Sequence, residues 1–318
     1  MKKEMSERPS INDILSQNFV IEKVNTLGIK IPSLSIVERL MRSNRSSFEE
    51  EKSISYSKAS SASDCSELLF IKLYTNQLFA VSLNSRECTK LFDLSIDLFS
   101  YGSAYIPDSQ STFFYGGYTN GRTTGIAFIV DKDKNYIELS SGASTHGVGL
   151  AYHRNFVYAF GCHNQIVSAK YNLLANRWEP CEILPRGGEY TDACTAVFRD
   201  SVLMVAWYFS KLLSYDIRQN CFQEISDLNL SGLLRKEIFS YENRVYICEF
   251  LGSTYQSAIN DATAWEKVAG NTASNFAIIS HAMKFAENFY FVRNQGSDLP
   301  MLVEFNLKKK RLLHVKEL

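Results

Sequence analysis

A large residue, a polar turn and a second apolar residue recur along this chain at a nearly constant interval. The clearest copies run from Tyr171 to Trp178 and from Tyr215 to Phe222. The apolar residues that close six such turns lie 45, 42, 44, 43 and 47 positions apart; they are Leu91, Tyr136, Trp178, Phe222, Trp265 and Leu312. A period of this length is typical of a repeat architecture, in which each unit buries its apolar face against its neighbours.

A second series of polar turns supports the same period. Asn155, Asp200, Asn243 and Asn288 are separated by 45, 43 and 45 positions, and an apolar strand follows each of them. One period therefore contains four short antiparallel strands, a to d, separated by turn residues, which is typical of a β-propeller blade. Six periods fill residues 53–318, and we predict an all-β, six-bladed propeller over that range. Its first strand a is expected at Ile54–Ala59 and its last strand d at Arg311–Lys316.

Two local features resemble the Kelch repeat. Gly116 and Gly117 follow an apolar strand, and Tyr171 and Trp178 are spaced as in the later part of a Kelch blade. The resemblance extends over about five sixths of the chain. Both glycines of the motif are present in one blade only, and in the next blade Gly161 matches one of the two. The resemblance implies a Kelch-type propeller. Such propellers include protein-binding modules, substrate-recognition subunits of ubiquitin ligases, a sugar mutarotase and a copper oxidase.

Residues 1–52 do not show the strand and turn pattern. Ser10 precedes apolar residues at helical spacing, a second short helix is expected from Ser35 to Leu40, and 43–51 is polar. We expect a helical or partly disordered N-terminal extension and linker at 1–52, before the propeller at 53–318.

Charge and cysteine content limit the possible partners and location. The 34 basic and 34 acidic side chains balance, which argues against nucleic acid as partner. No apolar run is long enough for a membrane span. The seven cysteines include no C-x-x-C pair and the start lacks a signal peptide, so we expect reduced thiols in a cytoplasmic protein. Lys308–Arg311 resembles a nuclear-localisation run, but a solvated hairpin turn is the simpler interpretation.

Motifs that would indicate catalysis are absent from the sequence. There is no nucleophile elbow, zinc-protease helix or phosphate-binding loop, and the five histidines are scattered. We therefore expect no catalytic, cofactor-binding or metal-binding residues. The enzyme alternative, of mutarotase or oxidase type, would place its chemistry at the channel mouth.

Blade geometry predicts where a partner polypeptide binds. In an up-and-down blade the b–c and d–a loops open on the same end of the ring, which we call the loop face. Longer loops there contain Tyr118, His146 and the residue types that dominate binding hot spots. We predict a monomeric, non-catalytic scaffold whose partner contacts are Arg122, Arg186, Tyr190, Trp207, Tyr208, Tyr255 and Arg293.

Overall fold

The computed structural model describes one part of the chain. It divides the chain into units 1–55 and 56–318, and all described residues belong to the second unit. These residues are 66–161, 167–185, 190–207, 209–225, 230, 236–249, 253–258, 260–270, 277–295 and 299–318. The predicted extension at 1–52 and the predicted strand at Ile54–Ala59 lie outside them.

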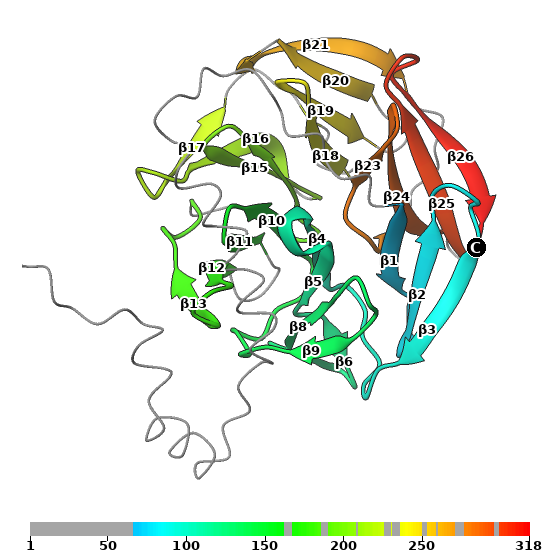
Figure 1. The fold of residues 1–318 in the computed structure, drawn as a ribbon. Helices are drawn as coiled ribbons and strands as arrows, with labels where there is room; N and C mark the ends of the chain where they lie inside the picture. Colours follow the sequence, from blue (N-terminus) through cyan, green and yellow to red (C-terminus); the bar gives the residue numbers. More distant parts are fainter. Residues whose placement is uncertain are drawn as a thin grey trace, which may run out of the picture. The chain divides into compact units, whose positions relative to one another are not determined.

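Six antiparallel sheets follow one another along the chain and are arranged around a common axis (Figure 1). The six-bladed β-propeller is thereby confirmed. Blade 1 contains β1 (Glu67–Ile71), β2 (Gln77–Ser82) and β3 (Cys88–Asp93); blade 2 contains β4 (Gly102–Ile106), β5 (Ser111–Tyr115), β8 (Ala127–Val130) and β9 (Tyr136–Glu138); blade 3 contains β10 (Val148–His153), β11 (Phe156–Gly161), β12 (Val167–Asn172) and β13 (Arg177–Pro180).

The other three blades repeat this order. Blade 4 contains β14 (Cys194–Phe198), β15 (Ser201–Ala206), β16 (Phe209–Asp216) and β17 (Cys221–Ile225); blade 5 contains β18 (Lys236–Tyr241), β19 (Arg244–Glu249), β20 (Ser253–Ala258) and β21 (Asp261–Gly270); blade 6 contains β22 (Ala277–Ile278), β23 (Met283–Phe285), β24 (Asn288–Gln295), β25 (Leu299–Asn306) and β26 (Arg311–Glu317). A separate hairpin, β6 (Tyr118–Thr119) and β7 (Arg122–Thr123), lies between β5 and β8, and the 3-10 helix η1 spans Pro107–Ser109.

The c–d turns explain the sequence repeat. In blade 4 the Tyr215 hydroxyl donates a hydrogen bond to the Asn220 side chain at 2.6 Å, and Asn220 has a φ of 52°. The Asp216 carboxylate accepts from two backbone N–H groups of the same turn. Asn tolerates the left-handed conformation, and Asp closes such turns through its side chain. Tyr171 and Asn176 form the same bond in blade 3.

Six hydrophobic clusters hold the blades together, each between two neighbouring blades. Between blades 3 and 4, Phe160 packs on Tyr215 and Phe222 with ring centroids 4.9 and 5.0 Å apart. Between blades 6 and 1, the cluster joins Leu68 and Phe70 to Val292 and Leu302. Because every interface is apolar and buried, each sheet depends on both of its neighbours.

Side-chain contacts close the ring between blades 6 and 1. The buried Tyr101 hydroxyl accepts a hydrogen bond from the Ile71 N–H of blade 1 at 2.7 Å, and it donates to the Ile279 carbonyl of blade 6. On the channel side, the backbone N–H of His281 in blade 6 donates to the Ser103 hydroxyl of blade 2 at 2.9 Å. The outermost strand of blade 6 is the C-terminal β26, as predicted, and Lys316 there donates to the Arg86 carbonyl of blade 1 at 3.0 Å.

Replacing Tyr101 with Phe should lower the free energy of unfolding by about 1–3 kcal/mol, because a buried N–H and a buried carbonyl lose their partner. The control is Tyr158→Phe, since Tyr158 is also buried and its hydroxyl makes no hydrogen bond within the described residues. That change should stay within about 0.5 kcal/mol. Urea denaturation measures both, and equal losses in the two variants would contradict the bridging role.

Deleting residues 311–318 should prevent cooperative folding. The deletion removes β26, exposes the edge of β25 and uncovers the buried residues Leu302, Val303 and Phe305. Calorimetry and circular dichroism of the truncated chain measure the effect. A soluble truncation that melts cooperatively at the wild-type temperature would show that the ring closes without its last strand.

Candidate functional site

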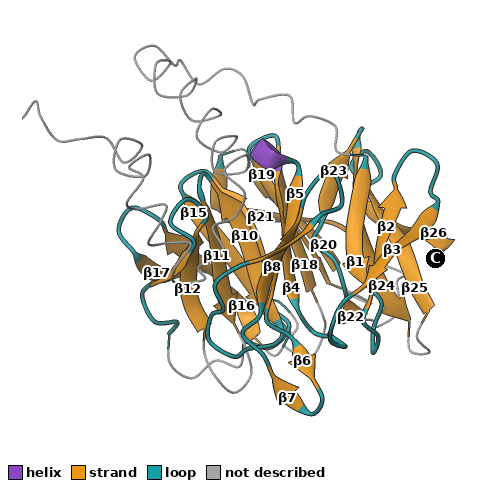
Figure 2. Ribbon diagram, turned by 60° about the horizontal axis from the view of Figure 1, so that its bottom comes forward, coloured by secondary structure: helices purple, strands orange, loops and turns teal. Residues whose placement is uncertain are grey.

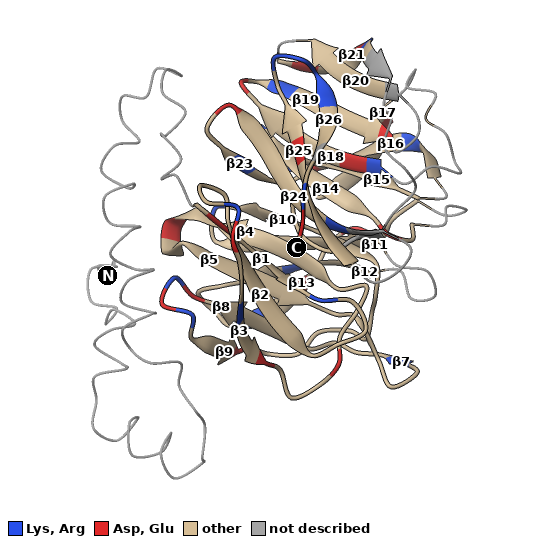
Figure 3. Cartoon of the chain, turned by 90° about the vertical axis from the view of Figure 1, so that its right-hand side faces the viewer, with Lys and Arg blue, Asp and Glu red and all other residues tan. Residues whose placement is uncertain are grey.

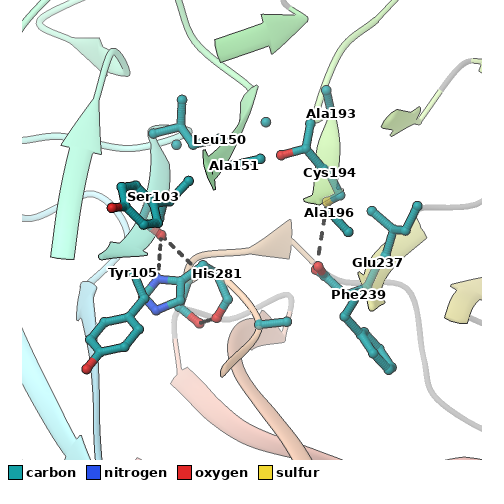
Figure 4. Close-up of a pocket in the computed structure, with 18 of the residues that line it drawn as sticks. Ser103, Tyr105, Leu150, Ala151, Ala193, Cys194, Ala196, Glu237, Phe239 and His281 are labelled. Carbon is teal, nitrogen blue, oxygen red and sulfur yellow. Dashed lines mark hydrogen bonds between the residues drawn. The ribbon is translucent and has the colours of Figure 1, made fainter. Parts of the chain in front are cut away.

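The inner strands of blades 2 to 6 surround a cavity of about 390 Å³ on the ring axis. Figure 4 shows two hydrogen-bonded pairs on opposite walls, Ser103 with His281 and Cys194 with Glu237. Small residues such as Gly149, Ala151 and Ala196 form much of the remaining lining. The cavity is therefore mostly apolar, with a few polar groups at fixed positions.

Glu237 is one of two acidic residues that line this cavity, and the other is Asp192. The side chain of Glu237 is 4% exposed, and its Oε2 accepts a hydrogen bond from the Cys194 thiol, with the two atoms 3.7 Å apart. Burial raises the pKa of Glu237 to about 8, because the charged carboxylate loses its hydration, while hydrogen bonds from the Ile238 N–H and from Cys194 oppose the rise. At neutral pH the protonated carboxyl predominates and can donate a hydrogen bond.

His281 lies on the opposite wall, and its Nδ1 is 3.3 Å from the Ser103 hydroxyl. Its ring lies nearly parallel to that of Tyr105, with centroids 6.3 Å apart. Burial lowers the pKa of His281 to about 4, because the imidazolium form would lose its hydration. His281 is therefore neutral at pH 7, as is the facing Glu237.

Lys236 precedes Glu237 in β18 and lies at the loop-face end of the wall that contains Glu237. Its ammonium group donates to the carbonyls of Ala206 and Trp207 at 3.0 and 3.2 Å. Burial lowers the pKa of Lys236 to about 8, and the nearby Glu249 carboxylate opposes this shift. Lys236 thus supports the backbone of Trp207, one of the predicted contact residues.

The side chains that most often bind metals are not grouped together in the described part of the chain. Within the described ranges, no three His, Cys, Asp or Glu side chains lie close enough together to hold an ion. The same residues include no helix of the length and apolar character needed to cross a membrane. Figure 3 shows acidic and basic residues interspersed over the propeller.

Two of the predicted contact residues lie in the interior. Arg293 is fully buried, because β24 continues to Gln295 and the residue belongs to a strand where a loop was expected. Tyr190 is 1% exposed; its hydroxyl donates to the Pro185 carbonyl at 2.7 Å and its ring packs on Phe209. In this conformation neither side chain is accessible to a partner, and the expectation that they line an exposed surface is wrong.

The other predicted residues differ in their positions. Arg122 is exposed on β7, in the hairpin that projects from the end of the ring opposite to η1 (Figure 2). Trp207 is half-buried at the end of β15, and its N–H donates to the Thr191 carbonyl at 2.9 Å. Tyr255 belongs to β20 and packs against the core between blades 4 and 5. Arg186 and Tyr208 lie outside the described residues. Partner binding by any of them stays a prediction.

Four rings form a continuous row on the loop face, which we call the aromatic ladder: Tyr74, Phe99, Tyr118 and His146. Successive ring centroids are 5.0, 5.1 and 5.7 Å apart, and successive planes are inclined by 56°, 56° and 68°. Tyr74 is 62% exposed, and the other three rings are partly exposed. Sequence reasoning placed Tyr118 and His146 in loops of this face but missed Tyr74 and Phe99. The repeat itself contained a signal, because Tyr74 and Tyr118 follow equivalent strands one period apart.

Backbone hydrogen bonds fix the ladder to the ring. Phe99 and Tyr118 exchange two of them, with N–O distances of 3.2 and 2.8 Å, and the Gly117 N–H donates to the Thr145 carbonyl at 2.7 Å. Gly117 has a φ of 116°, and a Cβ there would lie 2.6 Å from Leu98 Cδ1 and 3.1 Å from the Phe99 carbonyl oxygen. The second glycine of the Kelch-like pair is therefore required for the close approach of these two loops.

Comparisons with known proteins do not identify the chain. No protein-family model matches it. The DNA polymerase IV proteins of two strains of Ureaplasma parvum serovar 3 are 33% identical over 94 residues. That segment covers 29% of this chain and 26% of each polymerase, so a small part of either protein is compared. A match of this extent assigns neither a family nor an activity.

Replacing Glu237 with Gln should make the protein more stable than wild type, increasingly so between pH 6.5 and 8. A carboxyl whose pKa rises on folding, here from 4.5 to about 8, holds its proton more tightly when folded. The wild-type free energy of unfolding therefore falls as pH rises through that interval, by up to about 1.4 kcal/mol per pH unit. The amide cannot ionise, so the difference should grow by up to about 2 kcal/mol from pH 6.5 to 8.

The two limits of this pH window separate the effect of Glu237 from those of His281 and Lys236. His281 affects stability between about 4 and 6.5, and Lys236 between about 8 and 10.5, and both lowered pKa values make stability rise with pH there. Urea denaturation of both proteins at several pH values measures the difference. A constant difference across pH 6.5–8 would mean that Glu237 is already ionised at the lower limit.

Proposed function

We propose that this chain is a Kelch-type propeller that acts as a non-catalytic platform for a partner polypeptide bound on the loop face. The Kelch assignment is supported by the diglycine at Gly116 and Gly117. Gly117 is needed for the close approach of the loops that contain Phe99 and Tyr118. The assignment is also supported by Tyr171 and Trp178, which are paired across β12 and β13 and whose rings contact each other edge to face with centroids 5.1 Å apart. The observation that most favours a platform is the aromatic ladder beside the exposed Arg122.

The distribution of exposed apolar side chains favours the same face. Five large apolar side chains of the described residues are exposed, and Tyr74, Ile183 and Leu299 lie in or beside b–c and d–a connections. Aromatic and Arg side chains on a rigid support are typical of binding hot spots. Loops held at fixed separation by a stiff sheet ring lose little conformational entropy on binding. Interspersed charges favour a protein partner over a polyanion.

The partner is best identified by capture with the full chain, followed by affinity measurement with the purified partner. Arg122→Glu should weaken binding by at least about tenfold, because an exposed guanidinium that makes no ion pair within the described residues would contact the partner. The matched control is Lys132→Glu, which reverses an exposed charge of the same blade in the c–d turn on the other end of the ring. This control should bind as wild type does.

The melting temperature should be the same in both variants, because each changed side chain is exposed. A second variant, Trp207→Ala, tests another part of the loop face. If neither Arg122→Glu nor Trp207→Ala changes the captured proteins, the partner binds elsewhere and the loop-face platform is wrong.

A further inference from the structure

We infer that the aromatic ladder binds a proline-rich segment in the polyproline II conformation. This inference rests on the proposed function, since it names the chemical class of the partner. The starting observation is that the four rings are inclined to one another. Inclined neighbours present ring faces and ring edges side by side, and aromatic side chains are the groups on which proline-rich segments dock.

The spacing of the rings agrees with this ligand. The ring centroids of Tyr74 and Phe99 are 5.0 Å apart, and those of Phe99 and Tyr118 are 5.1 Å apart. The distance between the alternate rings Tyr74 and Tyr118 is therefore at most the sum of these two distances. A polyproline II helix advances about 9 Å per turn of three residues. Prolines three positions apart can therefore contact alternate rings, with the intervening residues directed away.

The polar groups beside the ladder match the backbone of such a segment. Proline lacks an N–H, so a proline-rich strand presents carbonyl acceptors and needs donors from the protein. Within the described residues the Tyr74 hydroxyl makes no hydrogen bond and the Arg122 guanidinium makes no ion pair. Both are exposed on the loop face, and both can donate to peptide carbonyls.

Charge argues against an acidic or nucleic-acid ligand at this site. Arg293, which could have supplied a second positive charge, is buried, and the exposed Asp97 lies two residues before Phe99. Single-stranded nucleic acid requires a basic track beside the stacking rings. A neutral, stiff segment needs none, and its small loss of conformational entropy suits a ladder that backbone bonds already hold in place.

The test is calorimetric titration of the full chain with a capped decaproline peptide, and with a Gly-Ser peptide of equal length as the control ligand. Decaproline should bind saturably and the Gly-Ser peptide should not. The variant Tyr74→Asn should weaken decaproline binding by at least about tenfold. Asn is chosen because residue 74 has a φ of 58°, where Asn is among the best tolerated residues. The variant should therefore fold.

Tyr136→Ala is the matched control, because it removes an exposed tyrosine, 42% exposed, from the first position of β9, directly after the c–d turn of blade 2. Decaproline affinity should be unchanged in this variant. Equal affinity in wild type and Tyr74→Asn would place the peptide elsewhere and overturn the inference. If decaproline fails to bind while partner capture still depends on Arg122, the ligand class is wrong and the platform stands. If decaproline fails to bind and partner capture is independent of both Arg122 and Trp207, both proposals fail.

Discussion

Burial of apolar surface between neighbouring blades is the constraint on which this propeller depends. A four-stranded sheet has two faces and too few contacts to bury either alone, so each blade requires both neighbours. The interface between blades 6 and 1 joins sequence-distant parts of the chain, for example Phe70 with Leu302. In the described residues no strand is exchanged between these two blades, and packing together with the Tyr101 hydrogen bonds holds them in place. The strength of this interface decides whether the ring is closed.

Ring closure also determines the chemistry of the channel. The inner strands converge on the axis, and they hold Glu237, Lys236 and His281 where burial desolvates their charged forms. Each of these groups therefore favours its neutral form, which raises the pKa of the carboxyl and lowers those of the two bases. Shifted pKa values are common at catalytic sites, but a closed ring produces them from burial alone. The lining of this channel thus differs from the loop face, where charged groups such as Arg122 remain exposed.

The sequence predicted the architecture because the repeat reflects a local physical cause. Each c–d turn needs residues that tolerate its backbone conformation, and Asn176 and Asn220 meet this need at equivalent positions. Side-chain burial was predicted less well, because it depends on where each strand ends. β24 extends to Gln295 and so includes Arg293, whereas the diverged repeats indicated a loop there. The aromatic ladder requires contacts between four rings from four different connections, and the spacing of turn residues does not indicate that these connections lie close together.

On the proposed function, a ring of this kind separates the residues that stabilise the fold from the residues that bind a partner. The ladder residues belong to connections between strands, yet Phe99 and Tyr118 exchange backbone hydrogen bonds and Gly117 lets their loops approach. Their rings are therefore positioned before any ligand arrives, and binding energy is not spent on ordering them. Tyr74 can change with little effect on the blades, since it is 62% exposed and belongs to none of the six hydrophobic clusters. Divergence of the loop face in a propeller is consequently compatible with an unchanged core, and ligand specificity follows from the loops rather than from the repeat.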